Sequence, residues 1–260
     1  DNGGRLQCVD LNTLQLKYVV DVTDETDGSV VVEESYDEST VYLYTASQVK
    51  QSNGDAGKGY GYSYMRRING LTGGVVWTQQ QLCSIGDSAN SGGTVSTPHV
   101  GRYGTNMSNL VIYSVSLAVL GTGETPAEAT PDPAGDAQSA TDGGNAGTDT
   151  ASQAAYALGG RILALDKSTG EVVWSKEQQD DYWSSPVVIY DGNGRGYLIQ
   201  CDRGGTVTLY DGAEGTQLTT LDLGSRIDST PAVYGDYLVV GTRGKGGSGK
   251  AAKIACVKIS

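Results

Sequence analysis

The sequence lacks several features that define familiar functional classes. It contains one histidine, His99, among 260 residues, so a metal site built from several histidines is excluded within this chain. A histidine-based catalytic triad depends on that one residue, and we interpret His99, which follows Pro98 on a strand-like stretch, as structural. There is no run of about 18 apolar residues, the length that a membrane-spanning helix needs, and the first residues show no signal-peptide pattern. We therefore expect the chain, as given, to be soluble and to have no membrane span.

Cysteine is scarce as well, and its spacing does not suit metal binding. The four cysteines show no CxxC or zinc-finger pattern: Cys8, Cys83, Cys201 and Cys256. They permit three complete sets of pairs, and the sequence does not choose among them. Because cysteine is commonly buried, we favour buried free thiols, and a disulfide between two of the four stays open. No metal site is predicted.

Positive charge is also in short supply. The formal net charge is -12 and the sequence pI is about 4.4. Basic residues gather only in the pair Arg66 and Arg67 and in residues 243–253. Nucleic acids and anionic membrane surfaces bind proteins through basic patches, so we expect neither as a partner.

What the sequence does contain is a repeated hairpin. The clearest example is residues 159–174, GGRILALDKSTGEVVW, in which two β-prone stretches flank a turn. Asp166 and Thr169 can bond to the amides of that turn, and Gly170 can adopt the positive φ that such a turn commonly needs. Four segments share this phase, with the turns DLNTLQ, NGLTGG, DKSTGE and DGAEGT: residues 4–21, 64–77, 161–174 and 206–221. Asp or Asn opens every turn, and Gly closes three of the four.

Each hairpin is followed by a polar connection and two further strands. Ser185 and Thr230 each precede a proline at the start of a strand, and they are 45 residues apart. This interval is the size of one four-stranded antiparallel propeller blade. Longer intervals contain insertions between the second and third strands: residues 48–62, 120–158 and 245–250. These insertions leave the same face of a propeller. The composition of residues 120–158 predicts a flexible, low-complexity insertion.

The repeats predict an all-β protein, with residues 1–260 forming one partial β-propeller domain of four-stranded antiparallel blades. The chain begins on a third strand, residues 6–10, and ends on another third strand, residues 253–259. About four blades are present, so we expect an incomplete ring. Missing N-terminal blades or a second copy of the chain, in a homodimer, would supply the rest of the ring.

The repeats resemble those of the pyrroloquinoline-quinone-like (PQQ-like) β-propeller family. The family motif ALDxxTGxxxW is complete in one repeat, at Ala164, Leu165, Asp166, Thr169, Gly170 and Trp174, and partial in another, at Asn69, Thr72, Gly73 and Trp77. The resemblance implies that Trp174 and Trp77 pack between blades and that the turn supports them, while no equivalent tryptophan stands at Val19 or Thr219. It also implies a likeness to the C-terminal half of a larger, bacterial BamB-like repeat protein.

A PQQ-dependent quinoprotein dehydrogenase is the alternative function, because the family is named for that cofactor. The resemblance implies that such an enzyme has a disulfide between adjacent cysteines, a calcium ion and a catalytic Asp, and no two cysteines are adjacent here. Residues 191–196, DGNGRG, begin like a calcium loop, but Arg195 replaces an acidic ligand and Asp202 stands where the last Glu belongs. We therefore expect no cofactor, no metal and no enzymatic activity.

The function that we favour is a non-catalytic binding or scaffold module. The connections into the first strands share a face with the insertions, and loops on a rigid frame commonly carry recognition. The candidate contact residues in these connections are Asp181, Tyr182, Trp183, Arg226 and Asp228. The resemblance to BamB-type assembly lipoproteins favours a protein partner, leaves a glycan ligand open and implies an extracellular or cell-surface location.

Overall fold

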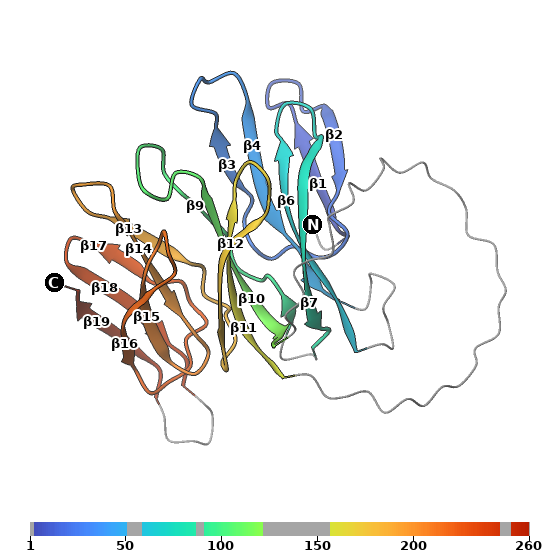
Figure 1. Ribbon diagram of the computed structural model, residues 1–260. Helices are drawn as coiled ribbons and strands as arrows, with labels where there is room; N and C mark the ends of the chain where they lie inside the picture. The colour runs from blue at the N-terminus through green and yellow to red at the C-terminus, as the bar shows by residue number, and fades with distance from the viewer. Residues whose placement is uncertain (1–2, 51–58, 87–90, 122–156, 245–250, 260) are drawn as a thin grey trace, which may run out of the picture.

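The computed structural model describes residues 3–50, 59–86, 91–121, 157–244 and 251–259, and every regular element in those ranges is a β-strand. The predicted insertion at residues 120–158 and the tip at residues 245–250 fall largely or wholly outside these ranges. The strands group into five consecutive units, which we call blades 1 to 5. They follow one another as a curved fan from the N-terminal to the C-terminal end (Figure 1).

Blades 2, 3 and 4 each have four antiparallel strands in chain order. Blade 2 contains β3 (Val31–Glu34), β4 (Val41–Ala46), β6 (Tyr60–Asn69) and β7 (Val75–Ser84). Blade 3 contains β9 (His99–Val100), β10 (Leu110–Val119), β11 (Leu158–Asp166) and β12 (Val172–Gln178). Blade 4 contains β13 (Val187–Tyr190), β14 (Gly196–Cys201), β15 (Thr206–Asp211) and β16 (Gln217–Asp222). Blades 2 and 3 also touch through the short strands β5 (Gln48–Val49) and β8 (Gly92–Gly93).

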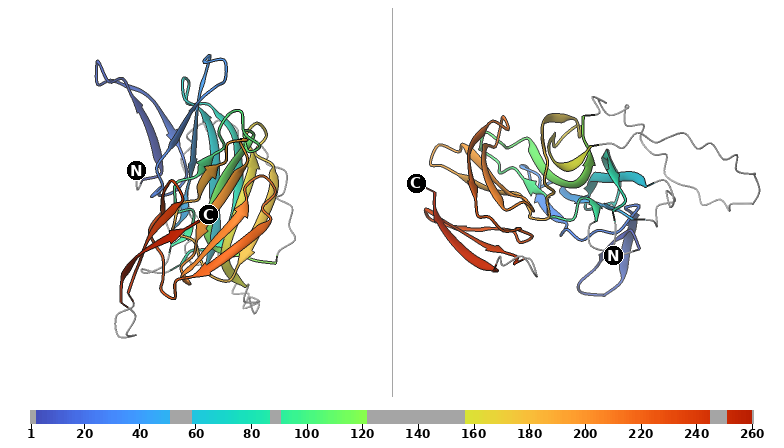
Figure 2. Two further views of the ribbon diagram at one scale, coloured as in Figure 1. Left: turned by 90° about the vertical axis from the view of Figure 1, so that its left-hand side faces the viewer. Right: turned by 90° about the horizontal axis from the view of Figure 1, so that it is seen from below.

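The two end blades are partial, in the phase that the sequence predicts. Blade 1 contains β1 (Arg5–Val9) and β2 (Leu16–Asp21), which correspond to the third and fourth strands of a complete blade. Blade 5 contains β17 (Ala232–Tyr234), β18 (Tyr237–Thr242) and β19 (Lys253–Lys258), the first to third strands. The described strands form an open fan whose end blades lie apart (Figure 2), which confirms an incomplete ring.

Apolar side chains from facing sheets hold the blades together. Four buried clusters fill the four junctions between blades. Val20 and Ile68 represent the cluster between blades 1 and 2, and Tyr44 and Leu163 the one between blades 2 and 3. Ile162 and Leu198 represent the cluster between blades 3 and 4, and Ile199 and Leu238 the one between blades 4 and 5. Each fully buried aliphatic or aromatic side chain contributes about 1.5–3 kcal/mol relative to an exposed one. The strands alternate, so that each sheet presents apolar residues to both of its neighbours.

The turn between the third and fourth strands has the same hydrogen bonds in each repeat. Asp166 Oδ1 accepts hydrogen bonds from the amides of Ser168 (2.7 Å) and Thr169 (3.0 Å), and Thr169 Oγ1 accepts one from the amide of Glu171 (3.2 Å). Asp10, Asn69 and Asp211 accept the corresponding pair of bonds in the other turns. In blade 2, Thr72 Oγ1 accepts from the amide of Gly74 (3.2 Å), as Thr169 does in blade 3. The repeated Asp or Asn therefore closes the hairpin and is part of the frame.

In blades 1 to 3, an aromatic residue on the fourth strand packs against the turn of the next blade. The indole of Trp77 lies on Gly170, where an added Cβ would be 2.7 Å from the ring, and Nε1 of Trp77 donates a 2.8 Å hydrogen bond to the carbonyl of Lys167. Trp174 lies in the same way on Gly215 of blade 4. Both glycines have positive φ, as does Gly73 in blade 2.

The expectation that blade 1 lacks an equivalent of these tryptophans is wrong. Tyr18 takes the position, since it lies on Gly73 and donates a 2.7 Å hydrogen bond to the carbonyl of Gly70. The comparison with Val19 counts one residue too far, because Trp77 lies eight residues after Asn69 and Tyr18 lies eight residues after Asp10. In blade 4 the position is held by Thr219, which has no aromatic ring.

Hydroxyl groups before the first strands link successive blades on the inner side of the fan. The amide of Ser29 donates to Thr97 Oγ1 (2.9 Å), and the amide of Thr97 donates to Ser185 Oγ (3.1 Å). The amide of Ser185 donates in turn to Thr230 Oγ1 (3.1 Å). This ladder fixes the spacing of the connections in which the candidate contact residues lie.

Candidate functional site

Four of the five candidate contact residues meet between blades 4 and 5, together with two arginines that the sequence analysis did not select. We call this group the rim cluster. Its members are Asp181, Trp183, Arg203, Arg226, Asp228 and Arg243. Two come from the connection before β13, two from the connection before β17, and one each from the ends of β14 and β18.

Backbone hydrogen bonds set the position of the cluster. The amide of Arg203 donates to the carbonyl of Asp181 (2.8 Å), and the amide of Arg243 donates to the carbonyl of Arg226 (2.6 Å). In both blades the end of the second strand is thereby tied to the connection that precedes the first strand. The arginine side chains consequently start from fixed points next to Trp183 and Asp228.

Trp183 lies at the centre of the cluster. The guanidinium carbon of Arg203 is 4.0 Å from the centroid of the indole ring, and that of Arg226 is 5.2 Å away. Contacts at these distances are cation–π interactions, which contribute about 0.5–2 kcal/mol each depending on solvent exposure. The indole Nε1 is buried and has no hydrogen-bond partner in the part of the chain that the structure describes.

Asp228 is the shared acceptor for three guanidinium groups. Its Oδ1 accepts hydrogen bonds from Nε of Arg226 (2.6 Å) and Nε of Arg203 (3.3 Å), and its Oδ2 accepts from Nη1 of Arg243 (3.2 Å). Partial burial raises the pKa of Asp228, but the hydrogen bonds from Arg226 and Arg243 outweigh burial and hold the pKa below its ordinary value. Asp228 is therefore ionised at neutral pH.

Asp181 contributes a second carboxylate at the edge of the cluster. Its Oδ1 accepts a 2.9 Å hydrogen bond from the amide of Leu117, and its Oδ2 is 3.9 Å from Nη1 of Arg203. Burial raises the pKa of Asp181 and lowers that of Arg203. Three guanidinium groups thus face two carboxylates within the rim cluster, and the charge of Asp180, just outside it, raises the pKa of Asp181 further.

Tyr182, the fifth candidate, lies elsewhere. Its side chain is 1% exposed and packs in the apolar cluster between blades 3 and 4, and only its backbone takes part in the connection, where its carbonyl accepts a hydrogen bond from Ser116 Oγ. The expectation that its side chain faces a partner is not met, because the connection turns this residue inward. Arg203 and Arg243 were missed, although both follow a tyrosine by six residues, in YLIQCDR and YLVVGTR.

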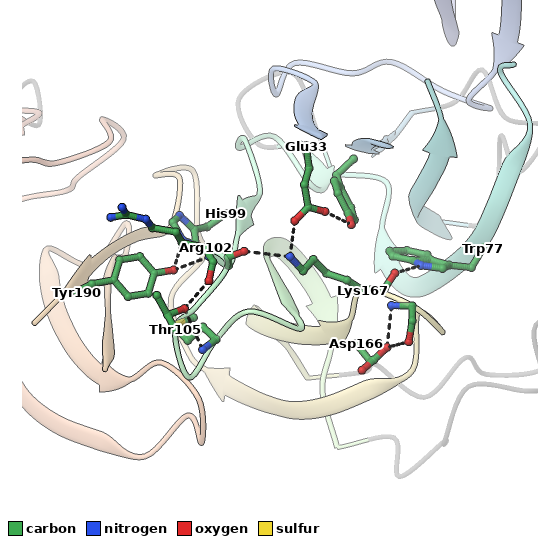
Figure 3. A network of polar contacts seen from close by, with 12 residues as sticks. Glu33, Trp77, His99, Arg102, Thr105, Asp166, Lys167 and Tyr190 are labelled. Carbon is green, nitrogen blue, oxygen red and sulfur yellow. Dashed lines mark hydrogen bonds and ion pairs between the residues drawn. The ribbon is translucent and has the colours of Figure 1, made fainter. Parts of the chain in front are cut away.

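A second polar network lies at the opposite end of the blades, between blades 2 and 3 (Figure 3). The ammonium group of Lys167 forms a buried ion pair with Glu33 Oε1 and donates to the carbonyl of Gly101 (3.0 Å). Tyr44 donates a 2.8 Å hydrogen bond to the other oxygen of Glu33. Burial lowers the pKa of Lys167, and the hydrogen bond that Lys167 donates to Glu33 opposes that shift. Since the network joins a turn of blade 3 to the first strands of blade 2, its role is to hold the two blades in place.

His99, on the first strand of blade 3, faces Tyr190 on the first strand of blade 4 (Figure 3). Its Nε2 is 3.4 Å from the hydroxyl of Tyr190, and burial, assisted by the charge of Lys167, lowers the pKa of His99 to about 4. A histidine with so low a pKa is neutral at physiological pH. Its packing agrees with the interpretation of His99 as structural.

The cysteines and the acidic residues do not form a metal or redox centre in the described ranges. All four cysteines are free thiols there, with Cys83 and Cys201 buried and Cys256 exposed, and burial raises the pKa of Cys83 and Cys201 to about 12. Among the residues with described positions, no three His, Cys, Asp or Glu side chains gather as they would around a metal ion. In the same ranges, no helix has the length and apolar character to cross a membrane.

Comparison with known proteins agrees with this architecture. Residues 158–254 match the family model described as outer membrane protein assembly factor BamB. The fold is similar to that of BamB from Moraxella catarrhalis, with a TM-score of 0.51 and 15% sequence identity over 99% of this chain and 53% of that one. It is also similar to a europium-containing methanol dehydrogenase, with a TM-score of 0.55 and 12% identity over 98% of this chain and 54% of that one. This chain therefore spans about half the length of these structures.

A curated relative shares a shorter stretch. The β-alanine-activating enzyme of Danio rerio is 30% identical over 86 residues, which make up 32% of this chain and 8% of that protein.

The repeats, the junctions between blades and the similarity of fold to these structures define an open β-propeller. Within it, blade 4 and most of the described part of blade 5 lie in the stretch that matches the BamB family model.

Proposed function

We propose that this propeller is a non-catalytic module that binds a protein partner through the rim cluster. The observation that carries the proposal is the convergence of Arg203, Arg226 and Arg243 on Asp228 beside Trp183. Tryptophan and arginine are the residue types most enriched among energetically dominant contacts of protein interfaces. A rigid frame that presents them on short connections suits recognition.

The charges of the cluster indicate what it binds. The side chain of Arg243 is 63% exposed, so part of its guanidinium group is available to a partner while Asp228 holds it in place. Arginine favours carboxylate groups because its planar donors match the two oxygens. We therefore expect an acidic side chain or a C-terminal carboxylate of the partner to lie against Arg243 and Arg226.

A protein partner fits the cluster better than a glycan. Sugars stack on open aromatic faces, and Arg203 already lies 4.0 Å from the centroid of the Trp183 ring. The match to a family described as an outer membrane assembly factor also supports a protein partner, and it supports a place outside the cytoplasm, at the surface of a bacterial cell or beyond it. Fractionation of the source cells tests the location.

The experiment compares the partners captured by the unchanged chain with those captured by three variants. Trp183→Ala combined with Arg226→Ala, and Arg243→Ala alone, should each lose the partner that the unchanged chain captures, identified by mass spectrometry after cross-linking. Arg195→Ala is the matched control, because Arg195 is another arginine paired with an aspartate, Asp211, but on a hairpin at the other end of blade 4. Partners retained by both rim variants, with unchanged thermal melts, would contradict the proposal.

The alternative, a quinoprotein dehydrogenase, makes a different prediction. The similarity to a methanol dehydrogenase concerns the fold, at 12% identity. Saturable binding of pyrroloquinoline quinone, followed by dye-linked alcohol oxidation, would support the enzyme, whereas we expect neither.

A further inference from the structure

Arg67 stands at a position of the repeat that is otherwise small or apolar. It lies two residues before Asn69, which opens the turn of blade 2, and the corresponding residues before the other turns are Cys8, Ala164 and Leu209. Ala164 and Leu209 pack in apolar clusters against the next blade. Arg67 therefore places a charge where the repeat otherwise provides packing, and departures from a local rule of this kind are expected at functional positions.

Two tyrosines of blade 2 hold the guanidinium group of Arg67. Its Cζ lies 3.5 Å from the centroid of the Tyr42 ring and 5.8 Å from that of the Tyr44 ring. A distance of 3.5 Å is van der Waals contact, so the guanidinium group lies face-on against the Tyr42 ring. The plane in which Arg67 offers its hydrogen bonds is thereby fixed.

The guanidinium group of Arg67 lacks an acceptor. Among the residues whose positions the structure describes, no carboxylate pairs with Arg67 and no oxygen accepts a hydrogen bond from it, although the residue is half-buried and its Nε is wholly buried. Arg161 and Arg195 differ in this respect, because they pair with Glu177 and Asp211. A buried donor without a partner is costly, and a bound acceptor would remove that cost.

The charges beside Arg67 favour an anion as that acceptor. The ammonium group of Lys167 pairs with Glu33 (Figure 3), whose other oxygen accepts a hydrogen bond from Tyr44. Burial lowers the pKa of Lys167, and the charge of Arg67 lowers it further. Asp166 also acts on Lys167, but its Oδ1 is occupied by the amides of its own turn. Two cations thus share the carboxylate of Glu33, and a second carboxylate would balance them.

Two further tyrosines provide an apolar surface next to these charges. The centroid of the Tyr103 ring is 4.7 Å from Nζ of Lys167. Burial raises the pKa of Tyr103, the charge of Glu33 adds to that shift, and the charge of Arg67 opposes it, so the hydroxyl lies near both groups. Tyr103 is 40% exposed, and Tyr36, which is 86% exposed, packs against it edge to face with 5.9 Å between the ring centroids. A ligand bound to Arg67 can rest an apolar part on these rings.

We propose that Arg67 binds the carboxylate of a ligand whose apolar part lies against Tyr103 and Tyr36. A carboxylate is flat and can pair with the guanidinium group in the plane that Tyr42 fixes, whereas a tetrahedral phosphate places oxygens outside that plane. The site lies between blades 2 and 3, which both have four strands. It is at the opposite end of the blades from the rim cluster, and the proposal stands independently of the proposed function.

Titration with small acids tests the site in the full chain. The probe is 3-phenylpropionate, and NMR follows the Nε–H signal of Arg67, which is assigned by its loss in Arg67→Lys. We expect saturable binding with a Kd on the order of 1 mM. The neutral control, 3-phenylpropanamide, has the same apolar part and should bind about tenfold more weakly or worse. Equal binding of the amide, tighter binding of phenyl phosphate, or no response of the Arg67 signal would overturn the proposal.

A peptide identifies the source of the carboxylate. Acetyl-glycyl-seryl-phenylalanine carries the same phenyl group and a free C-terminal carboxylate. Binding that is about tenfold tighter than that of 3-phenylpropionate would support the proposal with the end of a polypeptide as the ligand, because the added residues then contribute contacts. Equal or weaker binding would support it with a free acid as the ligand.

Substitutions separate binding from a structural role. Arg67→Lys keeps the charge but loses the flat pair of donors, and it should raise the Kd of 3-phenylpropionate about tenfold. The matched control is Arg195→Lys, because Arg195 also lies near a tyrosine ring, 5.5 Å from that of Tyr197, but already pairs with Asp211; its Kd should not change. Tyr36→Ala should raise the Kd about threefold. Thermal melts show whether each variant is folded. An unchanged Kd in Arg67→Lys, or an equal rise in Arg195→Lys, would overturn the proposal.

Discussion

Trp77 and Lys167 join blades 2 and 3 through one hydrogen bond, from the indole Nε1 to the backbone carbonyl, at 2.8 Å. The same turn of blade 3 receives the face of the indole on Gly170, and the side chain of Lys167 reaches back to Glu33 of blade 2. A single turn therefore carries packing, a hydrogen bond and an ion pair across the junction. The frame that holds the rim cluster depends on junctions of this kind.

Gly170→Ala should destabilise the fold. The substitution places a methyl group 2.7 Å from the Trp77 ring on a residue with a φ of 77°, and we expect a loss of about 2–4 kcal/mol, from left-handed backbone strain and overpacking together. Urea unfolding measures it. Gly192→Ala is the control, because an added Cβ there meets nothing within 4 Å. Equal stability of the two variants would show that the contact between the Trp77 ring and Gly170 does not constrain the turn.

Leu14→Gly should stabilise the fold. Leu14 has a φ of 55° and stands in the turn of blade 1 at the position of Gly73, Gly170 and Gly215, and the residue is 74% exposed. Relief of the left-handed strain should raise the free energy of unfolding by about 0.5–1 kcal/mol. Leu11→Gly, in the same turn but without positive φ, should bring no gain. A lower stability for Leu14→Gly would contradict this account of the turn.

Replacing Lys167 alone should lower the free energy of unfolding more than replacing both Lys167 and Glu33. Lys167→Met leaves a buried carboxylate unpaired and should destabilise the fold by about 3–5 kcal/mol. The double variant Lys167→Met with Glu33→Gln should recover much of that loss, which chemical denaturation of the three chains would measure. A double variant that is less stable than Lys167→Met alone would contradict this coupling.

His99 should make stability depend on pH. Its pKa falls from 6.5 to about 4 on folding, so the unfolded chain binds the proton more readily and stability decreases as pH falls from about 6.5 to 4. A shift of this size corresponds to about 3 kcal/mol at the acid end of that window. Because the chain has one histidine, His99→Gln should remove this contribution to the pH dependence of stability. The pH dependence that remains below about pH 5 should come from the carboxylates. Identical pH profiles for the two chains between pH 7 and 5 would contradict the burial of a neutral imidazole.

The fold was predictable from the sequence because its signals are local. The Asp or Asn that opens each turn, the glycine that follows and the 45-residue spacing of the repeat all reflect bonds within one blade. The phase of the two end blades follows from the same spacing. Tyr18 could have been found too, since it lies eight residues after Asp10, as Trp77 lies eight after Asn69.

The rim cluster was predictable only in part. Trp183, Arg226 and Asp228 stand in connections that the repeat places on one face, but Arg203 and Arg243 follow second strands and join the cluster because blades 4 and 5 pack side by side. Tyr182 was misplaced because an irregular connection has no period from which the direction of a side chain can be counted. The meeting of residues from two blades depends on tertiary packing, which sequence spacing does not encode.

The most direct test of the central claim is site-specific photo-cross-linking from position 243 in source cells, compared with position 195. Arg243 and Arg195 are similarly exposed, at 63% and 52% of their side-chain surface, but only Arg243 belongs to the rim cluster. We predict one distinct cross-linked polypeptide from position 243 that is absent from position 195. No product at position 243, or the same products at both positions, would contradict the assignment of the rim cluster as the site that binds a partner.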